Sequence, residues 1–206
     1  MLEIFQKGGF VMWGLLALAI IAIAIILERF ITLYMLASAN PLKLVQKVID
    51  IIEEQGLKEA LDYLYDNPSP LAKVLAAGLE KVHQGKVAFE DAMVRKAVSE
   101  LAFLDRNMIY LSSITTIAPL LGFIGTIIGL MKAFNTIRIT GEVEPELVAG
   151  GISEALIATG AGFIIAAPAA LFYAIFTNRI NVYQRQIEEA SNALVEYLLE
   201  KGIIVA

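Results

Sequence analysis

The chain of 206 residues contains no cysteine and a single histidine, His83. A disulfide framework, thiolate metal sites, cysteine nucleophiles and a histidine cluster for a transition metal are therefore excluded. The sequence also lacks the phosphate loop, the HExxH pair and the GxSxG elbow of common enzyme sites. It predicts no enzyme, no cofactor and no metal site, and His83, close to Gly85 in a predicted turn, is interpreted as a solvated side chain.

Charged residues are scarce as well. They make up 18% of the chain against 58% hydrophobic residues, and the mean hydropathy is +0.70. An ordinary water-soluble domain rarely has this balance, so we predict a membrane protein. The net charge of -5 argues against a nucleic-acid partner, because phosphate binding needs a clustered basic surface.

Three apolar stretches are long enough to cross a membrane, since a hydrocarbon core of about 30 Å needs roughly 20 residues of helix. They run from Gly8 to Leu27, from Asn107 to Met131 and from Ala155 to Asn178. A cleaved signal peptide ending near Ala37-Ser38-Ala39 is an alternative for the first stretch. We predict a retained span, because its apolar run exceeds the roughly 7–15 residues of a signal sequence.

Basic residues near the spans predict the orientation. One side has Lys7, Lys132 and Arg138, whereas the other has Arg29, Lys43, Lys47, Arg95, Lys96, Arg106, Arg179 and Arg185. Because basic loops stay in the cytoplasm, the richer side is predicted to be cytoplasmic. The expected domains are an external N-terminus with the first span (1–28), a cytoplasmic helical region (29–106), the second and third spans with a short external loop (107–178), and a cytoplasmic C-terminal helix (179–206).

Apolar residues recur at helical spacing throughout the predicted cytoplasmic segments. Breaks are expected at Asn67-Pro68-Ser69-Pro70 and at His83-Gln84-Gly85. From Phe89 the pattern continues into the second span without a breaker, and after the third span it continues from Tyr183 to Tyr197. We therefore predict an all-α membrane protein whose second and third membrane helices both project into the cytoplasm.

Small and polar residues form a stripe on each of these two spans, at alternating spacings of four and three. The stripes are Thr115, Pro119, Gly122, Thr126, Gly129 and Ala133, and Ala155, Thr159, Gly162, Ala166, Ala169 and Tyr173. Helix packing is one interpretation, since membrane helices associate through small residues. The other is a tight conduit or a grip on another helix, to which Thr126 and Thr159 contribute hydroxyl groups.

Ionisable groups are almost absent at membrane depth. Glu154 is the one acid close to it, and it is either a functional acid or a solvated end of the third span. Pro119 and Pro168 each free a backbone carbonyl within a span. No Asp or Glu lies at the centre of either span, so a carboxylate proton relay would need an acid from a partner.

The segments Ile117–Met131 (IAPLLGFIGTIIGLM) and Gly151–Thr159 (GISEALIAT) resemble signatures of the ExbB/TolQ/MotA proton-channel family. The resemblance covers about half the chain, from Leu101 to Arg185. The layout of three spans and a large cytoplasmic connection is similar to ExbB and TolQ rather than to MotA.

The resemblance implies a homopentameric ring whose second and third spans line a pore around an ExbD- or TolR-like dimer, which supplies the missing aspartate. A TonB- or TolA-like protein and membrane lipids are further expected partners. The implied function is a proton-channel subunit of a motor driven by the proton-motive force in the bacterial inner membrane, with a periplasmic N-terminus and a cytoplasmic C-terminus. The alternative is a non-conducting scaffold for a partner helix.

Six residues are predicted to line the pore. The resemblance implies pore-lining roles for Thr126 and Thr159, a bend at Pro119 and a functional acid at Glu154, and the small stripes add Gly122 and Gly162.

Overall fold

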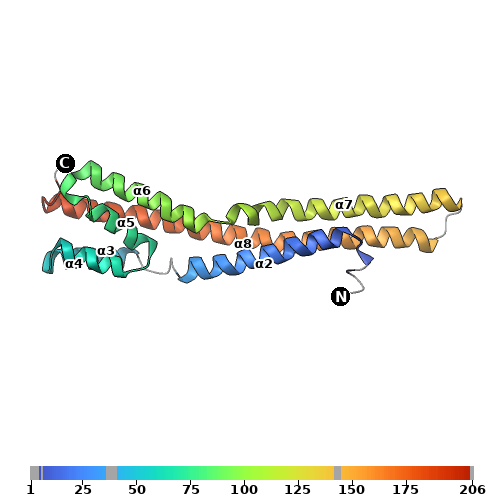
Figure 1. The fold of residues 1–206 in the computed structure, drawn as a ribbon, viewed down its shortest axis with the longest axis horizontal. Helices are drawn as coiled ribbons and strands as arrows, with labels where there is room; N and C mark the ends of the chain where they lie inside the picture. The colour runs from blue at the N-terminus through green and yellow to red at the C-terminus, as the bar shows by residue number, and fades with distance from the viewer. Residues whose placement is uncertain (1–4, 6, 36–40, 142–144, 205–206) are drawn as a thin grey trace. The chain divides into compact units, whose positions relative to one another are not determined.

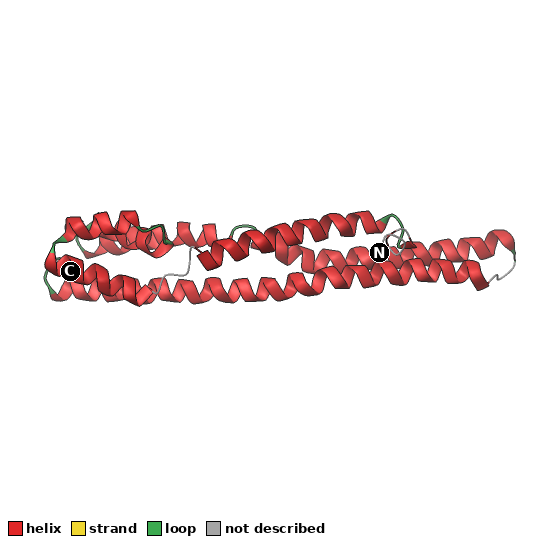
Figure 2. Cartoon of the chain, turned by 90° about the horizontal axis from the view of Figure 1, so that it is seen from below, coloured by secondary structure: helices red, strands yellow, loops and turns green. Residues whose placement is uncertain are grey.

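The computed structural model describes residues 5, 7–35, 41–141 and 145–204, and every regular element in these ranges is helical (Figure 2). The elements are α2 (Val11–Met35), α3 (Pro41–Glu54), α4 (Leu57–Asp66), α5 (Pro70–Leu79), the 3-10 turn η1 (Val82–Gln84), α6 (Lys86–Asp105), α7 (Met108–Thr140) and α8 (Pro145–Glu200). Three stretches are long and apolar enough to cross a membrane, within Val11–Tyr34, Lys86–Ile139 and Val148–Glu200. The predicted all-α membrane fold is confirmed, while Ala37-Ser38-Ala39 lies outside the described residues.

The first of two compact units comprises Met1–Glu28 and Asn107–Ile175. In it the part of α2 up to Glu28, α7 and the part of α8 up to Ile175 lie side by side (Figure 1). Up to Ile175 the buried hydrophobic side chains of α8 are alanines, including Ala155 and Ala158, and α7 buries Ala118 and Ala133 in the part that faces them. Large apolar side chains are exposed instead, among them Trp13, Ile20, Phe123, Phe134, Phe163 and Ile164. This inverted distribution suits a lipid environment, in which helices pack through small residues.

The second unit comprises Arg29–Arg106 and Phe176–Ala206. Its core resembles that of a soluble helical bundle, with buried Leu33, Val48, Leu64, Leu71, Leu75, Phe89, Tyr183, Leu194 and Leu198. The predicted break after α4 is present, and Ser69 caps α5 by accepting a hydrogen bond from the Ala72 amide at 3.2 Å, with Pro70 at the first helical position. A further break at Gly56, with φ of 101°, separates α3 from α4 and was not predicted.

The predicted uninterrupted helix from Phe89 into the second span was wrong. α6 ends at Asp105, and Asn107 adopts the left-handed conformation with φ of 66° before α7 begins. Asparagine tolerates this conformation better than most residues. Arg29 donates to the carbonyl oxygens of Phe103 and Leu104 at 3.1 and 2.9 Å, which are acceptors that a continuing helix would use for its own amides.

The corresponding prediction for the third span is confirmed, because α8 runs without interruption from Pro145 to Glu200. α7 continues past the predicted end of the second span at Met131, and α8 begins before the predicted start of the third span at Ala155. The chain between them is correspondingly short, with Gly141 as the C-cap of α7.

Candidate functional site

The two small-residue stripes meet in a close contact between α7 and α8. A Cβ atom added at Gly162 would lie 2.6 Å from the Ala118 carbonyl oxygen, and one at Gly122 would lie 2.9 Å from the Ala158 carbonyl oxygen. Gly129 and Gly151 face each other in the same way, with a Cβ at Gly129 only 2.7 Å from the Gly151 oxygen. The backbones of the two helices therefore touch, and glycine is the residue type that permits this approach.

Thr126 and Thr159 lie within this contact, and their hydroxyl groups hydrogen-bond to each other. The Thr159 hydroxyl also lies 3.2 Å from the Gly122 carbonyl oxygen across the helix pair, and the Thr126 hydroxyl lies 3.5 Å from the same oxygen. Three oxygen atoms from both helices thus share two hydroxyl protons. Since either threonine can donate to the other, the group has two proton arrangements without any change in backbone.

The remaining predicted site residues take different positions. Pro119 is partly exposed on α7 and lies within the helix, where it leaves the Thr115 carbonyl without its usual amide donor. Gly122 and Gly162 are buried between α7 and α8. Their closest neighbours are thus in the same chain, and any contact with a pore would require an assembled ring.

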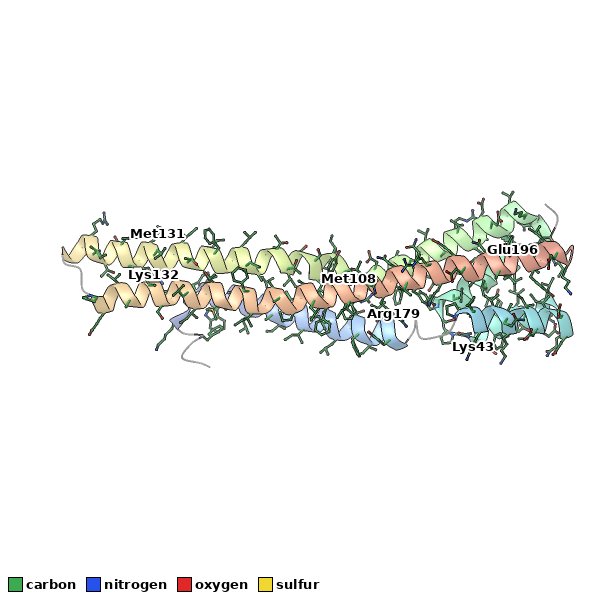
Figure 3. All side chains as sticks on the ribbon, turned by 180° about the vertical axis from the view of Figure 1, so that it is seen from behind. Lys43, Met108, Met131, Lys132, Arg179 and Glu196 are labelled. Carbon is green, nitrogen blue, oxygen red and sulfur yellow. The ribbon has the colours of Figure 1, made fainter. Side chains whose placement is uncertain are left out.

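Glu154 is paired rather than isolated. Its carboxylate lies 2.5 Å from the ammonium group of Lys132 on α7, a residue labelled in Figure 3. The Glu154 side chain is 19% exposed and the Lys132 side chain 57% exposed. The sequence interpretation treated Lys132 as a charge that limits the span and missed this pair.

The register of the helices could have revealed that pair. Lys132 follows Thr126 by six residues, and Glu154 precedes Thr159 by five. In an antiparallel pair that joins the two threonines, Lys132 and Glu154 lie at similar depth, each next to a stripe residue, so their long side chains can reach each other. Alignment of the two stripes against each other would therefore have indicated the pair, although neither residue belongs to a stripe.

The chemistry available to this site is limited to hydrogen bonding and charge. The sequence has no Asp or Glu between Asp105 and Glu142, or between Glu154 and Glu188. In the described part of the chain no three His, Asp or Glu side chains cluster as metal ligands. The site can orient a water molecule or a partner's polar group, but it brings no titratable group to the threonines.

Comparison with known proteins identifies the family. The model of the MotA/TolQ/ExbB proton channel family matches residues 66–189, which include α5, α6, α7 and most of α8. The chain belongs to this family. The predicted resemblance is confirmed, and the match extends further into α5 and α6 than the segments that suggested it.

Relatives in the MotA/TolQ/ExbB family carry ExbB names. The chain is 29% identical over 180 residues to a biopolymer transport protein ExbB homolog of Methanothermobacter thermautotrophicus, covering 87% of this chain and 64% of that protein. It is 33% identical over 182 residues to the ExbB-like 1 protein of Synechocystis, covering 86% and 71%. It is 27% identical over 170 residues to ExbB of Neisseria gonorrhoeae, covering 82% and 74%.

The alignment to the Methanothermobacter protein thus spans slightly less than two thirds of that relative. The family is one of transport proteins rather than of enzymes, and three apolar helical stretches make this member a multi-pass membrane protein.

Proposed function

We propose that the chain is a proton-channel subunit of a motor that is driven by the proton-motive force and transmits energy to partners in the cell envelope. The observation that carries the proposal is the hydroxyl pair of Thr126 and Thr159, with the Gly122 carbonyl as a shared acceptor, inside the segment that matches a proton-channel family. Hydroxyl groups that can donate or accept are suited to hold water or a partner carboxylate at membrane depth.

The titrating group comes from a partner in this proposal. Because neither span has an Asp or Glu at its centre, a single-span subunit of ExbD or TolR type would bring a membrane aspartate to the threonines. The energy would then pass to a TonB- or TolA-like protein. ExbB names among the relatives support this class of partner.

The proposed assembly is a homopentamer in the bacterial inner membrane. Thr126, Thr159, Pro119, Gly122, Gly162 and Glu154 would lie along or beside its central pore, with surrounding lipids on the outer surface. The N-terminus would be periplasmic, and residues 29–106 and 179–206 would be cytoplasmic, as the distribution of Lys and Arg predicts. Native mass spectrometry of the solubilised protein should show five copies, and a species no larger than a dimer would contradict the ring.

Proton flux through reconstituted vesicles tests the function. The chain, alone or co-expressed and purified with a single-span protein that carries a membrane aspartate, is placed in liposomes containing a pH-sensitive dye, and a potassium diffusion potential is imposed. We expect flux through one of these preparations, and a double Thr126→Val and Thr159→Val variant should lose most of it. Valine keeps the volume of threonine but removes the hydroxyl, whereas Thr→Ser at either position should keep much of the flux.

The control is Thr116→Val, which makes the same chemical change at an exposed position of α7. It should leave the flux unchanged. If the double valine variant assembles and conducts as well as the unmodified chain, the threonines serve only helix packing.

A non-conducting scaffold is the second candidate, and one observation favours it. Gly122, Gly129, Gly151 and Gly162 are all accounted for by the contact between α7 and α8 of the same chain. Absence of flux in both preparations, together with a stable complex with the single-span protein, would support this alternative.

A further inference from the structure

The ion pair of Lys132 and Glu154 joins the same two helices as the threonine pair. Lys132 lies about 9 Å beyond Thr126 along α7, and Glu154 lies about 8 Å before Thr159 along α8, at 1.5 Å per residue. Gly129 lies between Thr126 and Lys132 on α7 and packs against the backbone at Gly151 and Ala155, which flank Glu154 on α8. The ion pair therefore lies beside the glycine contact, and the hydroxyl pair lies between one and two turns away along the same two helices.

A third segment covers the carboxylate of this pair. Gly9, with φ of +73°, lies so close that a Cβ atom added there would collide with the Glu154 carboxylate. Its neighbour Gly8 is buried, and a Cβ there would lie 3.0 Å from Ile157. The chain before α2 thus packs on α8 beside Glu154, which explains why the acid is mostly buried while its lysine partner remains half exposed.

We propose that Lys132 is a positioning residue that clasps α8 to α7 through Glu154 and so sets the distance at which the Thr126 and Thr159 hydroxyls meet. Glu154 then acts as one half of the clasp and not as a proton carrier. The inference rests on the proposed function for its effect on flux, but the clasp itself is a property of the helix pair.

Charge exchange separates the two roles of Glu154. An ion pair that holds two helices together does so whichever helix carries the positive charge. Lys132→Glu combined with Glu154→Lys should therefore restore the stability and the flux that each single reversal removes. A proton-carrying acid does not have this symmetry, because its carboxylate would have moved from α8 to α7. The double-mutant cycle also isolates the interaction from effects of each substitution alone.

Two measurements are made on the full chain. Thermal unfolding in detergent should show a fall in the midpoint of about 3–10 °C for each single reversal, and recovery of most of it in the double variant. Proton flux, measured in the preparation that conducts, should fall at least about threefold in each single variant and return to within about twofold in the double variant. The double variant Lys132→Gln with Glu154→Gln removes both charges without placing like charges together, so it remains informative if the single reversals misfold. Its values should lie between those of the single reversals and of the unmodified chain in both measurements.

Arg138→Glu is the matched control, because it reverses the same charge on the same helix at a residue that donates to Asn135 rather than to an acid. It should leave the flux unchanged and lower the unfolding midpoint by less than either single reversal, because its only expected cost is that of an acid in the last turn of α7. Recovery of the unfolding midpoint without recovery of flux would overturn the proposal, since a carboxylate on α8 would then be required. Single reversals that behave like Arg138→Glu would overturn it as well. If the unmodified chain conducts nothing, the proposed function fails, and the unfolding cycle alone still decides whether the clasp exists.

Discussion

Arg29 is the largest fully buried side chain in the described residues. It belongs to the last turns of α2, and its guanidinium donates to two carbonyl oxygens in the last turn of α6. A positive group is well placed there, because the C-terminus of a helix carries partial negative charge and unsatisfied carbonyls. A single residue thus stabilises the end of a helix that lies more than seventy positions later in the sequence.

Replacement of Arg29 should therefore be costly. Arg29→Met removes the guanidinium donor from the buried Leu104 carbonyl oxygen and leaves the Phe103 oxygen only the Arg106 amide, so it should lower the free energy of unfolding by about 2–4 kcal/mol, whereas Arg29→Lys should lose about half as much. Chemical denaturation of the solubilised protein measures both. Arg95→Met is the comparison, because Arg95 is exposed and pairs with Asp91 one turn away, which is worth at most about 0.5 kcal/mol. Equal effects at the two arginines would refute the capping role.

Tyr183 provides a second long-range cap, in the second unit. Its buried hydroxyl accepts a hydrogen bond from the Leu71 amide in the first turn of α5 at 3.2 Å. Desolvation by burial raises the pKa of this hydroxyl, and the nearby charge of Glu100 acts in the same direction. The neutral hydroxyl is therefore favoured by the fold.

A raised pKa in the folded state predicts alkaline sensitivity. Stability from the neutral hydroxyl is fully present below the unfolded value of about 10 and is lost as the pH rises through the folded value. Tyr183→Phe should cost about 1–3 kcal/mol at neutral pH, because the Leu71 amide loses its acceptor. It should also flatten the decline of stability above pH 10. The exposed Tyr110→Phe serves as the control, and a Tyr183→Phe variant with the unaltered alkaline decline would argue against the assignment.

At the scale of elements, α7 and α8 approach each other at glycines, and an alanine substitution should affect stability differently at two glycines within one turn of α8. Gly162 faces the Ala118 backbone, whereas an atom added at Gly160 meets nothing within 4 Å. Gly162→Ala should destabilise the protein by about 1–3 kcal/mol, because the helices must separate. Gly160→Ala should instead stabilise it by about 0.5–1 kcal/mol, because alanine favours helix. Thermal unfolding of the two variants should show shifts of opposite sign, and shifts of the same sign would mean that the contact is loose.

The elements also show what the sequence could predict. Helices with clear apolar periodicity, the breaks at Pro68 and Gly85, and the positions of Thr126 and Thr159 on small-residue stripes all follow from local pattern and spacing. The break at Asn107 does not, because asparagine also occurs within helices and the residue that favours the break, Arg29, is remote in sequence. Gly122 and Gly162 were visible as small residues, but whether they face a neighbouring helix or a pore depends on the contact partner, which composition does not specify.

For the whole molecule, the membrane orientation is the property most directly open to test. Because the chain has no cysteine, a single introduced cysteine reports one position without background. Gly150→Cys lies on an exposed part of α8 with open space around it, and His83→Cys lies in an exposed turn. In intact cells an impermeant maleimide should label the first and should label the second only after lysis. The reverse pattern would invert the orientation that the Lys and Arg distribution predicts.

The backbone contact of α7 and α8 also has a genetic consequence. Every missense change of a glycine codon gives a larger residue, so none at Gly122, Gly129, Gly151 or Gly162 preserves the space that the contact needs. These four codons have no conservative neighbour. In a library of random single-base changes selected for function, these four codons should continue to encode glycine. The codon for Gly160 on α8 should instead accumulate changes to alanine and serine.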